Sequence, residues 1–172
     1  LIDVTVDASG VYTGSSQNWG RFHSTVRHYW SLGTSQLVLA HRFTFDSLWG
    51  DPPLMTLGEF GGLFPIEAYG GAFVGRGYGR RRFIGKHKAT AGVELRFAPV
   101  ELRLRRHTLG LGLELFLELG LVSQKLSELL KHWYVSGGPG ILLIWDRFVV
   151  FRIEGGFGRE GGAIYLQSEH AF

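Results

Sequence analysis

Apolar and polar residues alternate with a period of two through most of the chain. In residues 109–121 every odd position is leucine, while glycine, glutamate and one phenylalanine occupy the even positions. Successive residues of a β-strand point to opposite faces of the sheet. This segment therefore predicts a strand with one face of leucine and one face of glycine and carboxylate.

Similar segments divide the chain into eight predicted strands, at about 1–13, 19–32, 35–48, 87–99, 107–121, 132–145, 146–157 and 162–172. A long loop, 49–86, and a medium one, 121–131, alternate with short connections at 32–35, near 99–107 and at 145–147. After Pro99 the apolar positions change phase, which requires a bulge or an early turn.

Composition decides only partly between a soluble sandwich, whose leucine face would meet a core, and a membrane barrel, whose leucine face would meet lipid. Hydrophobic residues make up 45% of the chain and charged residues only 19%, yet no run approaches the roughly 18 apolar residues of a membrane-spanning helix. A closed barrel is the other structure that satisfies every backbone polar group in a bilayer. We therefore expect residues 1–172 to form one all-β domain, an eight-stranded antiparallel transmembrane β-barrel of the outer-membrane type. Its lipid-facing leucines would be Leu109, Leu111, Leu113, Leu115, Leu117 and Leu119.

Loop lengths predict the orientation of this barrel. Outer-membrane barrels have short periplasmic turns and longer outer loops, so loop 49–86 is expected to be extracellular and both termini periplasmic, in a bacterial outer membrane. The sequence starts at Leu1 without a Met or a signal peptide, and we expect the chain to be longer in life. Aromatic residues near strand ends are typical of interfacial girdles: Trp19, Tyr29, Trp30, Trp49, Trp133, Tyr134, Trp145, Phe148, Phe157 and Phe172.

Four sequence elements follow one another between about residues 60 and 172. The pair Gly70-Gly71 precedes Arg76-Gly77-Tyr78 in the long loop, and strand segments 94–97 (Glu-Leu-Arg-Phe) and 116–120 (Phe-Leu-Glu-Leu-Gly) come next, before a final Phe172. In this order they resemble the C-terminal barrel half of the bacterial surface-antigen family, the outer-membrane insertase and translocator superfamily. Residues 1–50 match that family only as generic strands.

The resemblance implies a larger barrel and a specific role for the loop. The family barrel has sixteen strands, and this chain matches the last eight, as either a half-size relative or half of a sixteen-stranded barrel. The family arginine folds back into the lumen and pairs with acids on neighbouring strands. The implied luminal loop lock comprises Arg76, Gly77, Tyr78, Glu94 and Glu118, although the family usually has Asp at the position of Glu118.

Elementary electrostatics favours the same pairing, because unpaired carboxylates inside a narrow barrel are costly. Glycines Gly70, Gly71 and Gly75 would let the loop backbone bend. The alternative is a mobile basic loop facing lipopolysaccharide. The resemblance also implies a C-terminal sorting signal at Tyr165, Leu166 and Phe172, read by the outer-membrane assembly machinery; Ser168 and His170 are more polar than such a signal usually is.

The expected function is therefore that of a non-enzymatic outer-membrane protein, a membrane anchor or structural component of a larger envelope assembly. One alternative is the C-terminal half of a sixteen-stranded insertase or translocator. Another is a soluble, lipocalin-like barrel that binds a small apolar ligand. Expected partners are outer-membrane lipids, lipopolysaccharide, the assembly machinery and other envelope proteins.

Other chemistry is not expected from this sequence. Cysteine is absent, which excludes disulfides, thiolate metal sites and a cysteine nucleophile. The net charge is only +3, with its cations concentrated in residues 76–88, so no nucleic-acid partner is expected. We find no phosphate-binding loop, nucleophile elbow or metal-like histidine cluster. No cofactor, metal or catalytic residue is predicted.

Overall fold

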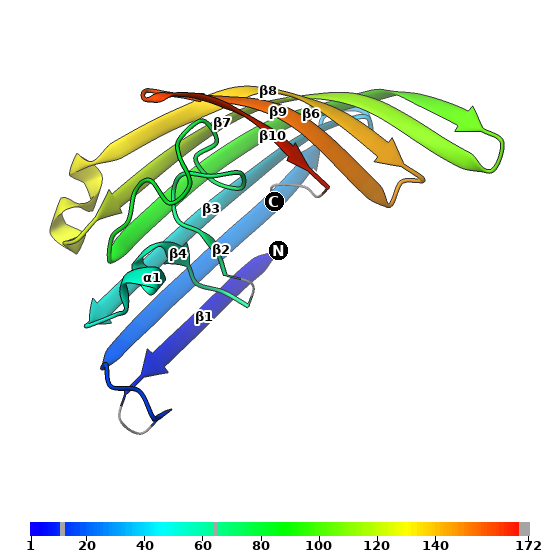
Figure 1. The fold of residues 1–172 in the computed structure, drawn as a ribbon. Helices are drawn as coiled ribbons and strands as arrows, with labels where there is room; N and C mark the ends of the chain where they lie inside the picture. Colours follow the sequence, from blue (N-terminus) through cyan, green and yellow to red (C-terminus); the bar gives the residue numbers. More distant parts are fainter. Residues whose placement is uncertain (11–12, 64, 169–172) are drawn as a thin grey trace.

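The computed structural model describes residues 1–10, 13–63 and 65–168, and most of them belong to one antiparallel sheet (Figure 1). Its eight strands are adjacent in chain order. The all-β prediction is confirmed, and each predicted strand has a counterpart whose ends differ by a few residues. The strands are β1 (Ile2–Ser9), β2 (Trp19–Ser31), β3 (Leu37–Gly50), β6 (His87–Leu104), β7 (His107–Ser123), β8 (Trp133–Trp145), β9 (Val149–Gly158) and β10 (Gly161–Gln167).

Short elements occupy the longer connections. The loop between β3 and β6 contains helix α1 (Leu54–Leu57) and a two-stranded sheet of β4 (Glu59–Phe60) and β5 (Ile66–Glu67). A 3-10 helix, η2 (Leu126–Lys131), precedes β8. Across the described residues, no helix has both the length and the apolar character needed to cross a membrane.

Strand β6 is longer than predicted because it continues through a bulge. Phe97 pairs with Leu113 of β7, but the next paired residue is Val100, which lies opposite Leu111. The irregularity falls at Pro99, whose ring nitrogen cannot donate a ladder hydrogen bond. The expected phase change is thus a bulge, and the turn to β7 is displaced to Arg105 and Arg106.

The two faces of the curved sheet differ in chemistry. Along β7, the side chain of Leu113 is 61% exposed, whereas Glu114 is 1% and Glu118 is 2% exposed. The long loop between β3 and β6 lies against the concave side (Figure 1) and covers the even-numbered residues of this strand. The buried core therefore lies between loop and sheet, while the leucine row lies on the open convex face.

The predicted barrel closure is wrong for the part of the chain that the structure describes. There β1 pairs only with β2, and β10 pairs only with β9, so the eight strands form an open sheet. An eight-stranded closed barrel has an interior just wide enough for side chains. Here the concave side also holds loop backbone, including that of the fully buried Arg76. A closed barrel of eight strands would have to hold this loop backbone in addition to its own inward side chains.

Candidate functional site

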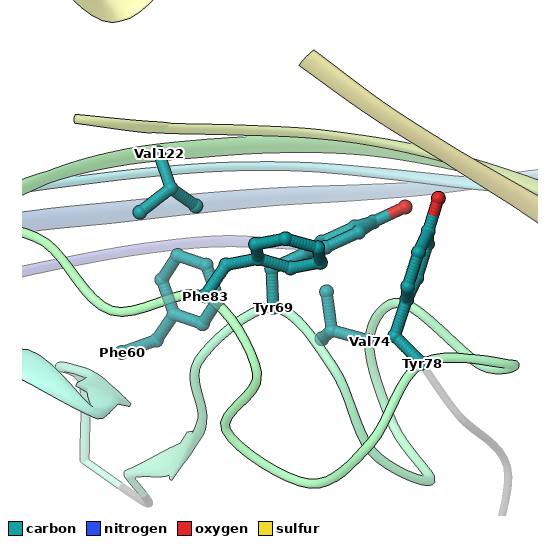
Figure 2. Close-up of a cluster of buried hydrophobic side chains, with 6 residues drawn as sticks. All are labelled: Phe60, Tyr69, Val74, Tyr78, Phe83 and Val122. Carbon is teal, nitrogen blue, oxygen red and sulfur yellow. The ribbon is translucent and has the colours of Figure 1, made fainter. Parts of the chain in front are cut away.

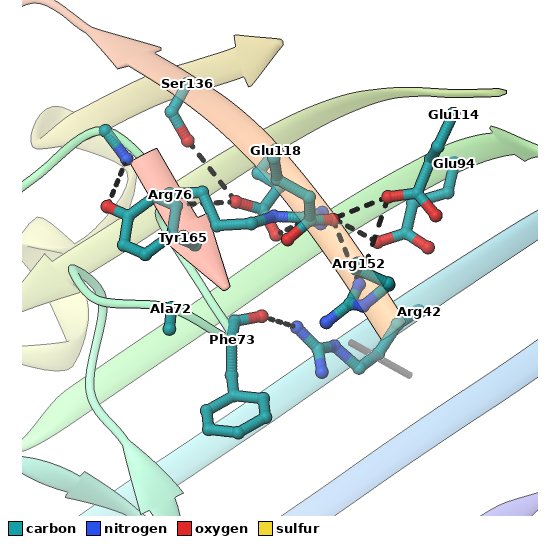
Figure 3. Close-up of polar contacts among 12 residues, drawn as sticks. Arg42, Ala72, Phe73, Arg76, Glu94, Glu114, Glu118, Ser136, Arg152 and Tyr165 are labelled. Atoms are coloured by element: carbon teal, nitrogen blue, oxygen red, sulfur yellow. Dashed lines mark hydrogen bonds and ion pairs between the residues drawn. The ribbon is translucent and has the colours of Figure 1, made fainter. Parts of the chain in front are cut away.

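The side chain of Arg76 lies at the centre of the concave face, where it meets four carboxylates (Figure 3). Nη1 is 2.6 Å from Oε1 of Glu154 and 3.4 Å from Oε1 of Glu114. Nη2 is 2.7 Å from Oε1 of Glu94 and 3.1 Å from Oε1 of Glu118. These five residues, here called the Arg76 site, come from the loop and from β6, β7 and β9.

The positions of the groups around the Arg76 guanidinium match the directions of its N–H donors. The planar fork places its N–H groups at its edge and leaves its faces free for aromatic contact. Four carboxylates surround the edge, and the ring centroid of Phe116 lies 3.6 Å from the Arg76 Cζ. The backbone N–H of Arg76 also donates to Oε2 of Glu118 at 2.9 Å. Both the side chain and the main chain of the loop are thus fixed to β7.

Further arginines of the sheet surround the same carboxylates. Arg96 pairs with Glu94 and, at 3.3 Å, with Glu114. Arg152 donates to Glu154 at 3.0 Å. Burial by itself lowers the pKa of Arg76, but the neighbouring Glu118 and Glu94, with the other two acids, raise it more, so its net pKa lies above the ordinary value. The Arg76 site therefore holds its cation in the charged form.

Several contacts fix the loop tip, residues 72–78, to β3 and to the edge strand β10. Arg42 of β3 donates to the carbonyl oxygen of Phe73 at 2.8 Å. On β10, Gln167 donates to the carbonyl oxygen of Ala72 at 2.7 Å, and the Tyr165 hydroxyl accepts from the backbone N–H of Gly77 at 2.8 Å. Strand β10, an edge strand, is therefore held by the loop as well as by β9.

Close approach of backbone to backbone explains the glycine at position 77. Its φ is +106°, and a Cβ there would lie 2.7 Å from backbone atoms of Phe157. Facing it, a Cβ on Gly156 would lie 2.6 Å from the carbonyl carbon of Arg76. The loop glycines expected from the sequence also have positive φ, at Gly70, Gly71 and Gly75. A side chain at Gly77 or Gly156 would push the loop backbone at Arg76 and Gly77 away from β9.

An apolar cluster supports the loop beside the Arg76 site (Figure 2). It consists of Phe60, Tyr69, Val74, Tyr78, Phe83 and Val122. The hydroxyl of Tyr69 donates to the carbonyl oxygen of Tyr134 at 3.0 Å, and that of Tyr78 to the carbonyl oxygen of Val135 at 2.9 Å. These tyrosines place apolar rings in the cluster while their hydroxyls bond β8, as buried tyrosines require.

A second polar cluster, in which basic side chains surround one carboxylate, holds the base of the loop. Buried Asp46 of β3 lies 3.1 Å from the Lys88 Nζ, 3.2 Å from the His23 Nδ1 and 3.5 Å from the Arg21 Nε, and it accepts from the Gly61 N–H at 2.8 Å. Arg21 also donates to the loop carbonyl oxygens of residues 56 and 59, and Lys88 donates to that of residue 57. One carboxylate thus organises three basic side chains around the loop base.

The structure brings together most, but not all, of the residues singled out in the sequence. Arg76 contacts Glu94 and Glu118 as expected, and Gly77 and Tyr78 lie directly beside it. Sequence reasoning missed two further acids, Glu114 and Glu154, and the basic residues Arg96, Arg152 and Arg42. Glu114 carried a signal, because it shares the even face of its strand with Glu118.

The residues of the expected sorting signal have different surroundings. Tyr165 turns inward to the loop, while Leu166 is exposed on the opposite side of β10. Phe172 lies outside the described residues. The sorting signal stays a prediction. In the structure, the Tyr165 hydroxyl accepts a hydrogen bond from the Gly77 N–H and so helps to hold the loop.

Three carboxylates of the Arg76 site are spaced as metal ligands are. Oxygens of Glu94, Glu114 and Glu154 lie within 4.8 Å of one another. The Arg76 guanidinium contacts all three, so the protein supplies its own cation at this position. No chemistry beyond charge compensation follows from this geometry.

No protein-family model matches the sequence, and neither does any curated protein or solved structure.

Replacing Arg76 with alanine should release the loop. Removing one partner of a buried ion pair leaves uncompensated charge and costs about 3–5 kcal/mol, and here four carboxylates lose their central cation. We expect Arg76→Ala to accelerate chymotryptic cleavage between residues 50 and 86, measured by mass spectrometry of timed digests. Chymotrypsin cuts after aromatic residues, so the substitution leaves its sites unchanged.

Arg80→Ala is the matched control, because Arg80 lies in the same loop but pairs with Glu67 in solvent. An exposed pair of this kind contributes about 0–1 kcal/mol, so cleavage should stay close to that of the unmodified chain. Equal cleavage rates for Arg76→Ala and Arg80→Ala would contradict the role given to Arg76.

Proposed function

We propose that this chain is an integral outer-membrane β-sheet protein without enzymatic activity, which resembles the insertase and translocator superfamily. It would serve as a membrane anchor or structural component of a larger envelope assembly. The observation that carries the proposal is the contrast between an exposed apolar convex face and a buried, charged concave face.

The apolar surface is continuous across strands. Register places Phe97, Leu113, Ile141 and Ile153 side by side on β6, β7, β8 and β9. Their exposed fractions range from 42% to 61%. Soluble monomers rarely expose a contiguous apolar patch of more than a few hundred Å². The hydrocarbon core of a bilayer would cover such an apolar face without a free-energy cost.

Tryptophans bracket this apolar surface. Exposed Trp133 and Trp145 begin and end β8. Twelve residue steps separate them, which is about 40 Å along the strand and, at a tilt of about 45°, about 28 Å across it. The outward apolar band of outer-membrane barrels is about 25 Å tall and is flanked by aromatic girdles. Trp30, near the end of β2, and Trp49, near the end of β3, extend the same pattern.

The soluble, ligand-binding alternative receives less support from the same observations. A lipocalin-like barrel encloses its apolar ligand, whereas here the concave side holds the Arg76 site and the loop. In the proposed orientation the loop end of the sheet faces the cell surface and lipopolysaccharide. The turns after β2, β6 and β8, with both termini, would face the periplasm, where assembly factors and other envelope proteins would be met.

A second candidate function, half of a sixteen-stranded insertase or translocator barrel, is favoured by the open sheet. Within the described residues, one edge each of β1 and β10 has no ladder partner, and free edges invite pairing with further strands. Eight more strands would close the sheet around a lumen wide enough for the loop. Arg76 would then fix the loop inside that lumen.

A charge on the convex face should impair folding into a bilayer in a depth-dependent way. Arginine at the bilayer midplane of such a barrel costs about 2–4 kcal/mol, but only about 0–1 kcal/mol near an interface. We expect Leu113→Arg to show the large cost and Leu109→Arg, on the same face near the strand end, the small one. Urea titrations of the chain folded into phosphatidylcholine vesicles measure both. Two equally small effects would show that the convex face lies outside lipid.

The mass of the protein purified from its native membrane separates the two candidates. The chain described here has a mass of 19.2 kDa. Half of a sixteen-stranded barrel requires a substantially heavier polypeptide with further alternating segments, and mass spectrometry would detect it. A native mass near 19.2 kDa would contradict the half-barrel.

A further inference from the structure

Strand β8 extends beyond its neighbour at the loop end of the sheet. The last ladder pair between β8 and β9 is Ser136 with Gly158, so the three residues from Trp133 to Val135 have no partner on that side. A cavity of about 600 Å³ occupies this position, between the loop, β8 and the β9–β10 turn. We call it the rim notch; its walls are Tyr78, Phe83, Trp133 and Tyr134, and Lys131 and Arg159 lie at its edge.

The aromatic wall of the rim notch is held in place before any ligand arrives. The rings of Phe83 and Tyr134 stack with centroids 3.6 Å apart, and the Tyr78 ring meets Phe83 edge-on at 5.1 Å. The Tyr78 hydroxyl donates to the carbonyl oxygen of Val135 and accepts from the Arg159 N–H at 3.2 Å. A wall that is already ordered lowers the entropy cost of binding.

The edge of the rim notch is cationic. Lys131 and Arg159 are both exposed there. The one acid in the lining, Glu160, accepts two hydrogen bonds from Arg82, at 2.7 and 3.0 Å. Its charge is therefore compensated from within the loop. Lys131 lies 3.8 Å from the Glu128 carboxylate in an exposed pair, so the charge of Arg159 is the one available to an anion.

We propose that the rim notch binds a phosphorylated sugar. The apolar C–H face of a sugar ring fits against flat aromatic side chains, and its hydroxyls reach the water at the edge. Arginine and lysine form strong, charge-assisted hydrogen bonds to phosphate oxygens. The cavity volume lies within the roughly 300–1,000 Å³ of small-molecule sites. The same chemistry occurs in a free sugar phosphate and in the headgroup of a phosphorylated glycolipid; the second source rests on the proposed outer-membrane function.

Isothermal titration calorimetry of the full chain, folded in detergent micelles, tests the site with three probes. We expect saturable binding of glucosamine 1-phosphate with a Kd below about 1 mM. Glucosamine alone and inorganic phosphate alone should each bind at least about tenfold more weakly, because each lacks one half of the recognised chemistry. No saturable binding, or equal binding of inorganic phosphate, would overturn the proposal.

Substitutions assign the binding to the rim notch. Arg159→Ala and Trp133→Leu, both at exposed positions, should each weaken glucosamine 1-phosphate binding about tenfold, the loss expected for one charge-assisted bond or one stacking face. Lys131→Ala replaces Arg159→Ala if the latter fails to fold. Lys125→Ala is the control, since it removes the same charge from the same end of the sheet outside the notch. Equal affinities in all these variants would contradict the assignment.

A competition experiment separates the two sources of the ligand. Vesicles that contain a phosphorylated glucosamine lipid should displace the soluble probe if the headgroup binds, and plain phosphatidylcholine vesicles should not. Displacement by neither identifies a free sugar phosphate as the ligand. Folding into vesicles is measured on the same sample, so an empty notch in a correctly inserted protein overturns this inference alone. Failed insertion, with binding intact in detergent, counts against the membrane proposal instead.

Discussion

Four glutamates converge on the concave face of the sheet, and the free energy of burying their charges depends on one arginine from the loop. Arg76 reaches all four at 2.6 to 3.4 Å, and its face packs on Phe116. Without it, the buried carboxylates would face only the sheet's own arginines, and unpaired buried charge is costly. Burial of the four glutamates therefore requires the loop to fold inward, and the inward position of the loop depends on its ion pairs with these glutamates.

Much of the remaining architecture follows from that constraint. Loop backbone at the centre of the concave face needs glycines where it meets β9, and it needs more room than eight closed strands can enclose. The sheet is accordingly open, with the loop tip bonded to Arg42 of β3 and to Tyr165 of the edge strand β10. Polar groups are gathered on the inside, so the convex face is left to apolar side chains.

The period-two pattern predicts the strands well, because it reports directly on which side chains share a face. It also places Glu94 and Glu118 inward, and the loop motif identifies Arg76. Other features depend on distant pairing that no local pattern records. Glu154 reaches Arg76 only through the register of β9 on β8. Asp46 of β3 pairs with basic side chains of β2 and β6, and closure depends on the curvature of the whole sheet. The contact of Tyr165 with Gly77 spans 88 residues, so no local pattern could indicate it.

A double-mutant cycle between Arg76 and Glu118 tests the central claim most directly. Unfolding free energies would be measured by urea titration in lipid vesicles for the unmodified chain, Arg76→Met, Glu118→Gln and the double variant. Contacting groups in one network typically couple by about 0.5–3 kcal/mol. The account predicts a coupling above about 1 kcal/mol, because Glu118→Gln should cost much less once the arginine is gone. Losses that add to within about 0.3–0.5 kcal/mol, as for independent sites, would contradict it.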